Sequence, residues 1–423
     1  MSHRRKTRRE FLRAATAAAT APYVITSAAL GGPGRLPASE RIGLGFVGLG
    51  GRGLGIMRHF LGRDAVCVAV CDTWADRLRR AKARGGGQCA AYGDFRELLA
   101  RDDVDAVVIA GPEHWHVPHS IAAAKAGKDA FCEKPLAVTV AEGRAFSRTF
   151  ERYGRVFQHG TQLRSGGNFR RACELVRNGR IGKLHTIRVG GQGGGGGGLR
   201  RPRPVPEGLD YEMWTGPAPR LPYVGQCGSC HAWGFRSEYS PGWVSGHGIH
   251  DVDIAQWGHG TERTGPVTVE GRGRFPADGF NDTAVTWHVE YAFADGVRMI
   301  YTSTNETPHG VRFEGDAGWV YVDHGGGLHA DPPGMLRSAI GPGEVHLYRS
   351  PGHARDFLRA VRTRRPTIAP AEVAHRSTSI CLLGDIAMRL GRKLRWDPDR
   401  ERFHDDPAAN ALLARPARPP WRM

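Results

Sequence analysis

Glu133, Lys134 and Pro135 place two opposite charges and a proline at the end of an apolar run. The preceding run, KDAFC, is typical of a buried strand, and the proline ends strand pairing because it fixes φ and has no amide proton. An ammonium group at this position can donate a hydrogen bond to a hydroxyl group and stabilise its alkoxide, and a neighbouring carboxylate can hold the ammonium in place. A surface ion pair that caps a strand explains these three residues equally well.

A second group of ionisable residues lies in the stretch SGHGIHDVD, which contains His247, His250, Asp251 and Asp253. If a helix begins near Gly248, His250 and Asp253 share a face because residues three apart are neighbours. A carboxylate beside an imidazole orients the ring and raises its basicity, which suits a general base near neutral pH. The same spacing could also hold a metal ion, or the histidines could simply satisfy local hydrogen bonds.

A glycine motif precedes both groups. An apolar strand leads into Gly48, Gly50 and Gly53, and the residues LGIMRHFL after them have helical spacing. The three glycines suit a tight turn, the close approach of a pyrophosphate, and helix–strand packing. The next predicted strand, AVCVAV, ends at Asp72, which can accept hydrogen bonds from ribose hydroxyls and repels a 2′-phosphate. The motif therefore predicts bound NAD, with NADP as the less favoured alternative because Arg77 lies nearby.

These motifs lie on alternating strands and helices. The runs DAVVIA and KDAFC are predicted strands, and the runs HSIAAAKAG and TVAEGRAFSRTFERYG are predicted helices. This alternation indicates an α/β fold with a doubly wound parallel sheet, whose ligands bind at the carboxyl ends of the strands. Later runs, such as 285–293, alternate as half-buried strands of a mostly antiparallel sheet do. We predict a signal and linker at 1–38, a Rossmann domain at 39–159, and an α/β domain with a large open sheet at 160–423.

A glycine-rich run and the cysteines complete the pattern. The run GGQGGGGGGLRRPRPVP predicts an irregular loop, and we favour a slack connector over a lid. Four cysteines in apolar patterns are expected to be small core residues: Cys67, Cys71, Cys132 and Cys381. Cys227, Cys230 and His231 form a CxxCH pattern, the attachment signal of a c-type haem. Their surroundings indicate a loop rather than an apolar haem pocket, so we favour a local disulfide or two free thiols.

The first 38 residues have the order of a twin-arginine export signal. Arg8 and Arg9 are followed by Phe11, Leu12 and a small apolar run. The run is too short and too alanine-rich for a membrane span, and a basic tail is the alternative interpretation. We expect export by the twin-arginine machinery to the periplasm, with membrane association if the signal stays uncleaved. The formal charge of +17 comes without a basic stripe interleaved with aromatic residues, so we expect no nucleic-acid partner.

Several blocks together resemble the Gfo/Idh/MocA oxidoreductase family. They include GLGGRG, DAVVIAGPEHWHVPHSIAAAKAGKDAFCEKPLAV, GTQLRSGGNFRRACELVRNGRIGKL, VPEGLDYEMWTGPAP and GIHDVDIAQWG. The resemblance implies an NAD(P)-dependent enzyme that acts on a sugar, cyclitol or related polyol, and a homodimer or homotetramer. It implies catalytic roles for Lys134 and His250, cofactor contacts from His116 and Glu133, and substrate contacts from Arg164, His247 and Asp253.

The chain departs from the family at one position. The family motif D-x-G-x-H-x-x-D matches Gly248, His250 and Asp253, but its first aspartate falls at Gly246. Either Asp251, His247 or a water replaces the missing carboxylate, or the activity is weak or altered. The family match also favours a site without a metal over a metal on this helix.

Three hypotheses follow. The first is an exported NAD-dependent oxidoreductase of a sugar, polyol or glycoside. Because free NAD is scarce outside the cytoplasm, its cofactor must be tightly held and recycled in place. The second is a redox-neutral, NAD-assisted glycoside hydrolase. The third is a sugar-binding relative with weakened catalysis.

Overall fold

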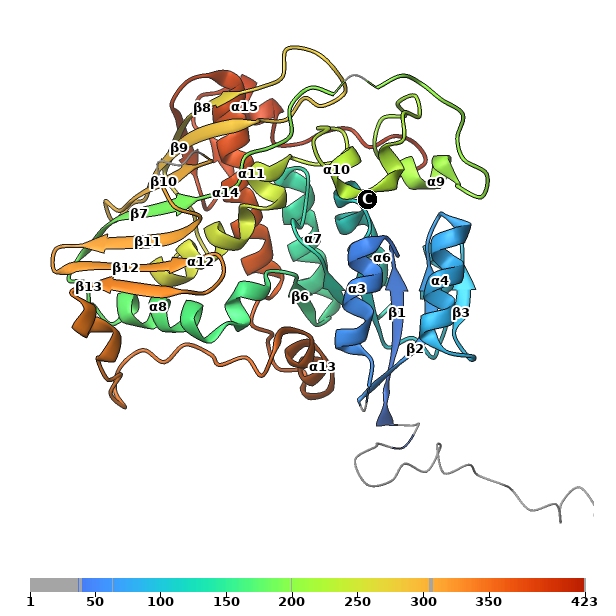
Figure 1. Ribbon diagram of the computed structural model, residues 1–423, viewed down its shortest axis with the longest axis horizontal. Coiled ribbons are helices and arrows are strands. Elements are labelled where there is room, and N and C mark those ends of the chain that lie inside the picture. Colours follow the sequence, from blue (N-terminus) through green and yellow to red (C-terminus); the bar gives the residue numbers. More distant parts are fainter. Residues whose placement is uncertain (1–36, 38–39, 63, 199, 304–306, 422–423) are drawn as a thin grey trace, which may run out of the picture. The chain divides into compact units, whose positions relative to one another are not determined.

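The computed structural model describes residues 37, 40–62, 64–198, 200–303 and 307–421. The predicted export signal, including Arg8 and Arg9, lies outside these residues. From Ile42 onward the chain forms one unit that contains two sheets (Figure 1). Among the described residues, none of the helices combines the length and the apolar character that crossing a membrane requires.

The first sheet has six parallel strands in the order β3-β2-β1-β4-β5-β6, which is the order of a Rossmann fold. Its strands are β1 (Ile42–Val47), β2 (Ala65–Cys71), β3 (Ala90–Tyr92), β4 (Ala106–Ile109), β5 (Asp129–Cys132) and β6 (Phe157–His159). Its helices are α3 (Gly51–Phe60), α4 (Ala75–Gly85), α5 (Phe95–Leu99), α6 (His116–Lys125) and α7 (Val140–Tyr153), with a 3₁₀ turn, η2 (Glu113–Trp115), before α6. The predicted parallel sheet is confirmed.

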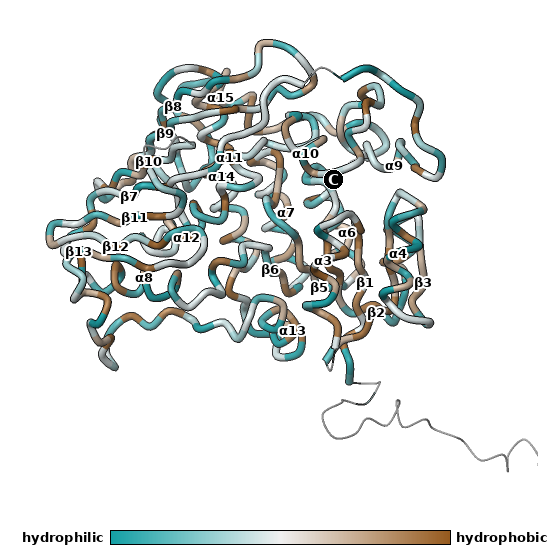
Figure 2. The backbone as a smooth tube through the Cα atoms, in the orientation of Figure 1, coloured by the Kyte–Doolittle hydropathy of each residue, from teal (hydrophilic) through white to brown (hydrophobic). Residues whose placement is uncertain are grey.

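The core of this sheet follows from its strand sequences. Every residue of β1 is buried, as expected for a parallel strand covered on both faces. The rings of Phe46, Phe60, Phe131 and Phe357 form a chain of edge contacts with centroids 5.0–6.4 Å apart. Phe357 belongs to α13 (His353–Thr363), so a late segment of the chain covers α3 and β5. Strands β1 and β2 consist largely of hydrophobic residues, while the loop before α9 is mostly hydrophilic (Figure 2).

The second sheet has nine strands in the order β13-β12-β11-β7-β10-β9-β8-β14-β15. They are β7 (Leu184–Gly190), β8 (Thr268–Arg274), β9 (Thr286–Ala292), β10 (Arg298–Thr302), β11 (Gly310–Gly315), β12 (Gly318–Asp323), β13 (Leu328–Asp331), β14 (Leu394–Asp397) and β15 (Arg402–Phe403). Among the described strands of this sheet, β7 and β10 alone pair in parallel. The predicted large, mostly antiparallel sheet is therefore confirmed.

Three helices pack against the second sheet: α8 (Gly167–Arg177), α12 (Ile249–His259) and α14 (Ala371–Leu390). Along β9, the buried residues Trp287, Val289 and Tyr291 alternate with half-exposed ones, so one face of the strand lies in the core. Helix α14 also contacts α7 and thereby joins the two sheets. The remaining elements are short: η3 (Gln162–Ser165), α9 (Tyr211–Thr215), η4 (Gln226–Gly228), α10 (Cys230–Trp233), α11 (Trp243–Gly246), η5 (Pro333–Arg337) and α15 (Pro407–Ala411).

The glycine run after β7 is irregular, as predicted, but it is not slack. The amide of Gly194 donates to the Val285 carbonyl at 2.8 Å, and the Gly197 carbonyl accepts from the Asn281 amide at 2.9 Å. A Cβ on Gly194 would lie 2.4 Å from the carbonyl oxygen of Ala284. Glycine is required because two backbones approach closely, so the prediction of a slack connector is wrong.

All eight cysteines lie in the described part of the chain and are free thiols. The four that were expected in the core are buried, which confirms that prediction. Of the CxxC pair, Cys227 is buried and Cys230 is exposed. They belong to η4 and α10, which lie against the Rossmann half, as described next.

Candidate active site

The carboxyl ends of β1, β2 and β4 open into a cavity of about 310 Å³. Gly48 has a φ of +82°, and a Cβ on Gly53 would lie 2.0 Å from the carbonyl oxygen of Gly48. Gly50 faces the cavity, where the nearest atom to its Cβ would be Arg77 Nη1 at 3.7 Å. Each glycine thus has the geometry that its predicted role requires: a turn, open access to a pyrophosphate, and close packing of helix on strand. The residues present fit a dinucleotide.

Asp72 lines the same cavity, and its carboxylate is fixed by two backbone amides. Oδ2 accepts from Leu49 N at 2.6 Å and Oδ1 from Trp74 N at 2.8 Å. Burial raises the pKa of Asp72, although the bond from Leu49 and the charge of Arg77 oppose this shift. The carboxylate is therefore held at the cavity wall, at the position predicted for a ribose contact.

Arg77 ties a second part of the chain to the cavity. Its Nη2 donates to the carbonyls of Cys227 at 2.6 Å and Gly228 at 2.9 Å, and its guanidinium lies over Trp74. We call residues 226–233 the cover segment, because four of its residues also line the cavity: Gly228, Ser229, Cys230 and Trp233. The CxxC motif therefore belongs to one wall of the dinucleotide cavity.

Lys134 follows β5 and reaches the other half of the chain. Its Nζ donates to the carbonyl of Gly246 at the end of α11. The carboxylate of Glu133 faces elsewhere: Oε1 accepts from Arg52 Nε at 2.8 Å and from Gln162 Nε2 at 3.0 Å. The prediction that Glu133 holds the lysine ammonium is therefore wrong, because Arg52 and Gln162 bind its carboxylate while the ammonium donates to the carbonyl of Gly246 instead.

His116 joins the loops that follow β4 and β5. Its Nδ1 lies 2.7 Å from the carbonyl oxygen of Pro135, and its Nε2 lies 2.9 Å from that of Gly111. The ring is buried, and this burial lowers its pKa. His116 thus fixes the loop that carries Lys134. Its predicted position beside the nicotinamide remains a prediction.

Asp253 does not orient His250, contrary to the expectation from their spacing. Arg164 donates to both oxygens of Asp253, at 2.5 and 2.9 Å, and Ser377 Oγ donates to Oδ1 at 2.6 Å. This buried pair fastens α12 to η3 and α14. The predicted substrate contacts of Arg164 and Asp253 remain predictions.

His250 has an unpartnered nitrogen facing the protein interior in the described structure. Its Nδ1 is buried and has no hydrogen-bond partner among the described residues. Burial, and then the charge of Lys134, lower the pKa of His250 well below its usual value. The imidazole is therefore neutral near pH 7 and can accept a proton.

A carboxyl group from the Rossmann half lies where the family motif has its aspartate. A Cβ on Gly246 would lie 3.1 Å from Oε1 of Glu113, which belongs to η2. Glu113 is 8% exposed, and burial raises its pKa to about 8 against the opposing effects of Ser240 and Lys134. One signal for it was present in the sequence: Glu113 lies three residues after the predicted strand DAVVIA, at the end where ligands bind. Asp251, His247 or a water was expected from the sequence as the replacement for the missing carboxylate, and Glu113 was not among them.

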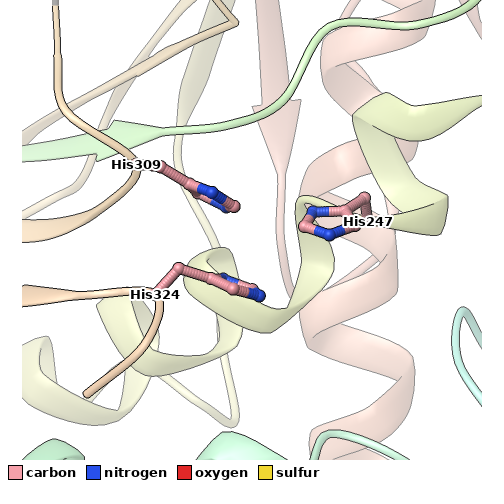
Figure 3. Close-up of side chains that lie close together, drawn as sticks. All are labelled: His247, His309 and His324. Atoms are coloured by element: carbon pink, nitrogen blue, oxygen red, sulfur yellow. The ribbon is translucent and has the colours of Figure 1, made fainter.

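His247 lies among two further histidines that the sequence had not singled out, His309 and His324 (Figure 3). Ring centroids are 5.3 Å apart for His247 and His309, and 4.9 Å apart for His247 and His324. His309 precedes β11 and His324 follows β12, so they are far from His247 in the sequence. Their spacing in the sequence did not predict a cluster, because the three histidines come together only through the fold.

Two family models match the chain. The model described as the oxidoreductase family, NAD-binding Rossmann fold, matches residues 42–161, and that of the oxidoreductase family, C-terminal alpha/beta domain, matches residues 194–423. The chain therefore belongs to the Gfo/Idh/MocA oxidoreductase family, which confirms the resemblance. NAD is the cofactor of its Rossmann domain.

Named relatives match mainly over a part of their length. Myo-inositol 2-dehydrogenase of Thermotoga maritima is 35% identical over 153 residues, which are 36% of this chain and 42% of that protein. A glycosyl hydrolase family 109 protein of Shewanella pealeana is 33% identical over 158 residues, which are 35% of each. The matched regions thus span less than half of these curated relatives.

Solved structures share the fold over most of the chain. The WlbA dehydrogenase from Bordetella pertussis, in complex with NADH and UDP-GlcNAcA, has a TM-score of 0.62 at 19% identity. The aldose-aldose oxidoreductase from Caulobacter crescentus, complexed with glycerol, has a TM-score of 0.60 at 20% identity. Each comparison covers 84% of this chain and 99% of the other, so the two-sheet architecture is common to all three.

Proposed function

We propose that this protein transfers a hydride between NAD and a hydroxyl-bearing carbon of a sugar or polyol. The observation that carries the proposal is the contact between Lys134 and the Gly246 carbonyl. It brings the ammonium of one half beside the helix of the other half that carries His250. Glu113 completes a group of three proton-handling side chains at Gly246, and it directly follows Gly111 and Pro112, which line the dinucleotide cavity. The names of relatives, among them a myo-inositol 2-dehydrogenase, support a polyol or sugar as substrate.

Bound NAD supplies a hydride acceptor. The ammonium of Lys134 donates a hydrogen bond to the reacting hydroxyl oxygen and stabilises its negative charge. His250 is neutral near pH 7 and accepts the hydroxyl proton. Glu113, whose pKa is about 8, is mostly protonated at that pH and donates a hydrogen bond at the position where the family has an aspartate.

The cavity favours NAD over NADP and holds it tightly. The carboxylate of Asp72 repels a 2′-phosphate. The guanidinium of Arg77 is already bound to two carbonyls of the cover segment, so it is not free to bind that phosphate. A dinucleotide beneath the cover segment can be retained through many turnovers, which suits a protein exported with its cofactor.

Purified full-length protein tests this function. We expect mass spectrometry of the denatured protein to detect NAD, and a panel of sugars and polyols to reduce it in a single turnover measured by NADH fluorescence. Lys134→Met should slow that turnover by about 10²–10⁴-fold without changing the NAD content. Lys128→Met is the matched control, since Lys128 lies just before the other end of β5 and bonds the Arg101 carbonyl. Protein without NAD affinity, or full turnover in Lys134→Met, would refute the proposal.

A redox-neutral glycoside hydrolase is the second candidate, because several relatives are named glycosyl hydrolase family 109 proteins. Such an enzyme oxidises the sugar only transiently and returns the hydride, so the NAD is regenerated. An aryl glycoside distinguishes the two functions. A hydrolase releases the aryl alcohol over many turnovers without net NADH, whereas a dehydrogenase accumulates one NADH per sugar oxidised. A sugar-binding relative gives neither product while still binding the sugar.

We also propose that the twin-arginine machinery exports the protein and that it forms a homodimer or homotetramer. The first proposal rests on Arg8 and Arg9 and the apolar run after them. Replacing both arginines with lysine should retain the protein in the cytoplasmic fraction, and unchanged export would contradict the proposal. Light scattering of the purified protein measures its mass, and a monomer at micromolar concentration would contradict the second proposal.

A further inference from the structure

Three imidazoles from separate segments converge beside the site (Figure 3). They belong to His247 between α11 and α12, His309 before β11, and His324 after β12. One nitrogen from each ring lies within 4.8 Å of the other two, and all three side chains are partly exposed. We propose that His247, His309 and His324 bind a divalent metal ion of the zinc class. Metal binding at these residues does not depend on the proposed hydride transfer.

Rigid elements hold the three rings together. Gly310 of β11 pairs with Asp323 of β12, so the residues just outside this pair lie next to each other. The amide of His324 donates to the carbonyl of His309 at 3.0 Å, and their rings stack with centroids 4.1 Å apart. His247 approaches from the opposite side, at the turn between two helices. Ligands placed on a hairpin end and a helix end need little ordering when an ion binds.

A buried carboxylate stands behind two of the rings. Asp251 is fully buried, and its Oδ2 lies 2.9 Å from Nδ1 of His324 and 3.3 Å from Nε2 of His309. Metal-binding histidines commonly give their second nitrogen to such a carboxylate, which fixes the ring and raises its basicity. Nε2 of His324 is thereby left for an ion. The negative charge of Asp251 also offsets part of the charge of a divalent cation.

One ring nitrogen in the cluster lacks a partner. Nδ1 of His247 is buried and forms no hydrogen bond with the described residues. A buried polar atom without a partner costs about 1–3 kcal/mol, so such an atom usually has a role. An ion bound by the cluster would satisfy it. Three imidazoles suit zinc, copper, iron or nickel rather than calcium or magnesium, which prefer oxygen ligands.

The cluster adjoins the lysine of the proposed reaction. Lys134 donates from its positively charged ammonium to the carbonyl of Gly246, the residue before His247. A cation at the three histidines would add to this positive charge and favour an anionic oxygen, such as an alkoxide or carboxylate, as its remaining ligand. This choice of ligand, unlike the metal site itself, rests on the proposed function.

Metal titration of the full chain tests the site. After dialysis against a chelator, we expect calorimetry to show one Zn²⁺ bound per chain, Co²⁺ to give the visible absorption of a low-coordinate site, and Zn²⁺ to raise the unfolding temperature. Asp251→Asn should weaken binding by about 10–100-fold. His309→Asn and His324→Asn should weaken it more than that, and His185→Ala should not change it, because His185 is an exposed histidine of β7 that bonds only its neighbour Thr186 in the described structure.

Two outcomes would overturn the proposal. One is the absence of saturable Zn²⁺ binding in folded wild-type protein. The other is Zn²⁺ binding that survives His309→Asn and His324→Asn but is lost in Cys230→Ser, which would place the metal at the CxxC thiols. Circular dichroism without metal shows whether each variant is folded. If one histidine variant fails to fold, the other still decides, because each removes a single ligand.

Discussion

Glu113→Gln should remove a pH dependence of stability that this one residue creates. Burial raises the pKa of Glu113 in the folded protein to about 8, whereas an unfolded glutamate has a pKa of about 4.3. Between these values the folded chain binds one proton more than the unfolded chain, so the free energy of unfolding falls by about 1.4 kcal/mol per pH unit as pH rises. From about pH 5.5 to 7.5 the loss is roughly 2.5 kcal/mol, and glutamine, which does not titrate, abolishes it.

Urea unfolding of the wild type and of Glu113→Gln at about pH 5.5, 6.5 and 7.5 measures this difference. The wild type should lose its advantage over the variant steadily as pH rises, because the cost of keeping a buried carboxyl group protonated grows with pH. Glu207→Gln controls for the loss of one carboxylate, since Glu207 is exposed in the loop before α9. All variants should keep the same m-value, which shows that the unfolded state is unchanged.

A difference between wild type and Glu113→Gln that stays constant over this range would refute the reasoning. It would mean that Glu113 is ionised in the folded protein, paired with the ammonium of Lys134. The carboxyl group would then act as a fixed negative charge beside Gly246 rather than as a hydrogen-bond donor.

Three further predictions concern the cofactor and acid stability. Gly53→Ala should abolish NADH binding in a fluorescence titration, because its Cβ would lie 2.0 Å from a backbone oxygen, while Gly51→Ala, with nothing within 4 Å, should bind normally; equal binding by both would contradict the proposed packing. Asp72→Ala should lower the ratio of NADP to NAD dissociation constants, since the charge that repels a 2′-phosphate is gone, and an unchanged ratio would remove Asp72 from cofactor selection. Burial alone would raise the pKa of Glu401, but hydrogen bonds from His375 and Arg144 lower it to about 2. The ionised Glu401 therefore stabilises the folded protein fully above its unfolded pKa, and this stabilisation is lost as pH falls toward 2. Thermal unfolding should therefore show Glu401→Gln less stable than wild type at about pH 6 and nearly equal to it near pH 2, and a deficit that persists in acid would count against this ion pair.

The Rossmann half was predictable because its signals are local. Glycine spacing, apolar runs and charges at strand ends lie within a few residues of one another, and each agrees with the observed elements. The short strands β3 (Ala90–Tyr92) and β6 (Phe157–His159) were missed, since three residues give too little periodicity to detect.

The site could be predicted only in part, because its remaining contacts are long-range. The helical spacing correctly predicts that His250 and Asp253 lie on one helix, yet Arg164, 89 residues away, binds the carboxylate. Likewise, the pairing of β11 with β12 brings His309 beside His324, and the approach of η2 to α11 supplies Glu113. Local spacing predicts which side chains lie on the same helix or strand, but it does not determine which distant residue each of them contacts.

The bonds from Arg77 to the cover segment have a kinetic consequence. If the cover segment moves aside when the dinucleotide leaves, two charge-assisted hydrogen bonds of Arg77 break first, each worth about 1.5–3 kcal/mol. Since every 1.4 kcal/mol corresponds to a factor of ten, the two together can slow exchange by roughly two to four orders of magnitude. The residence time of the nucleotide is then set by an arginine of helix α4 and by two carbonyls of the cover segment, rather than by the glycine turn beneath it.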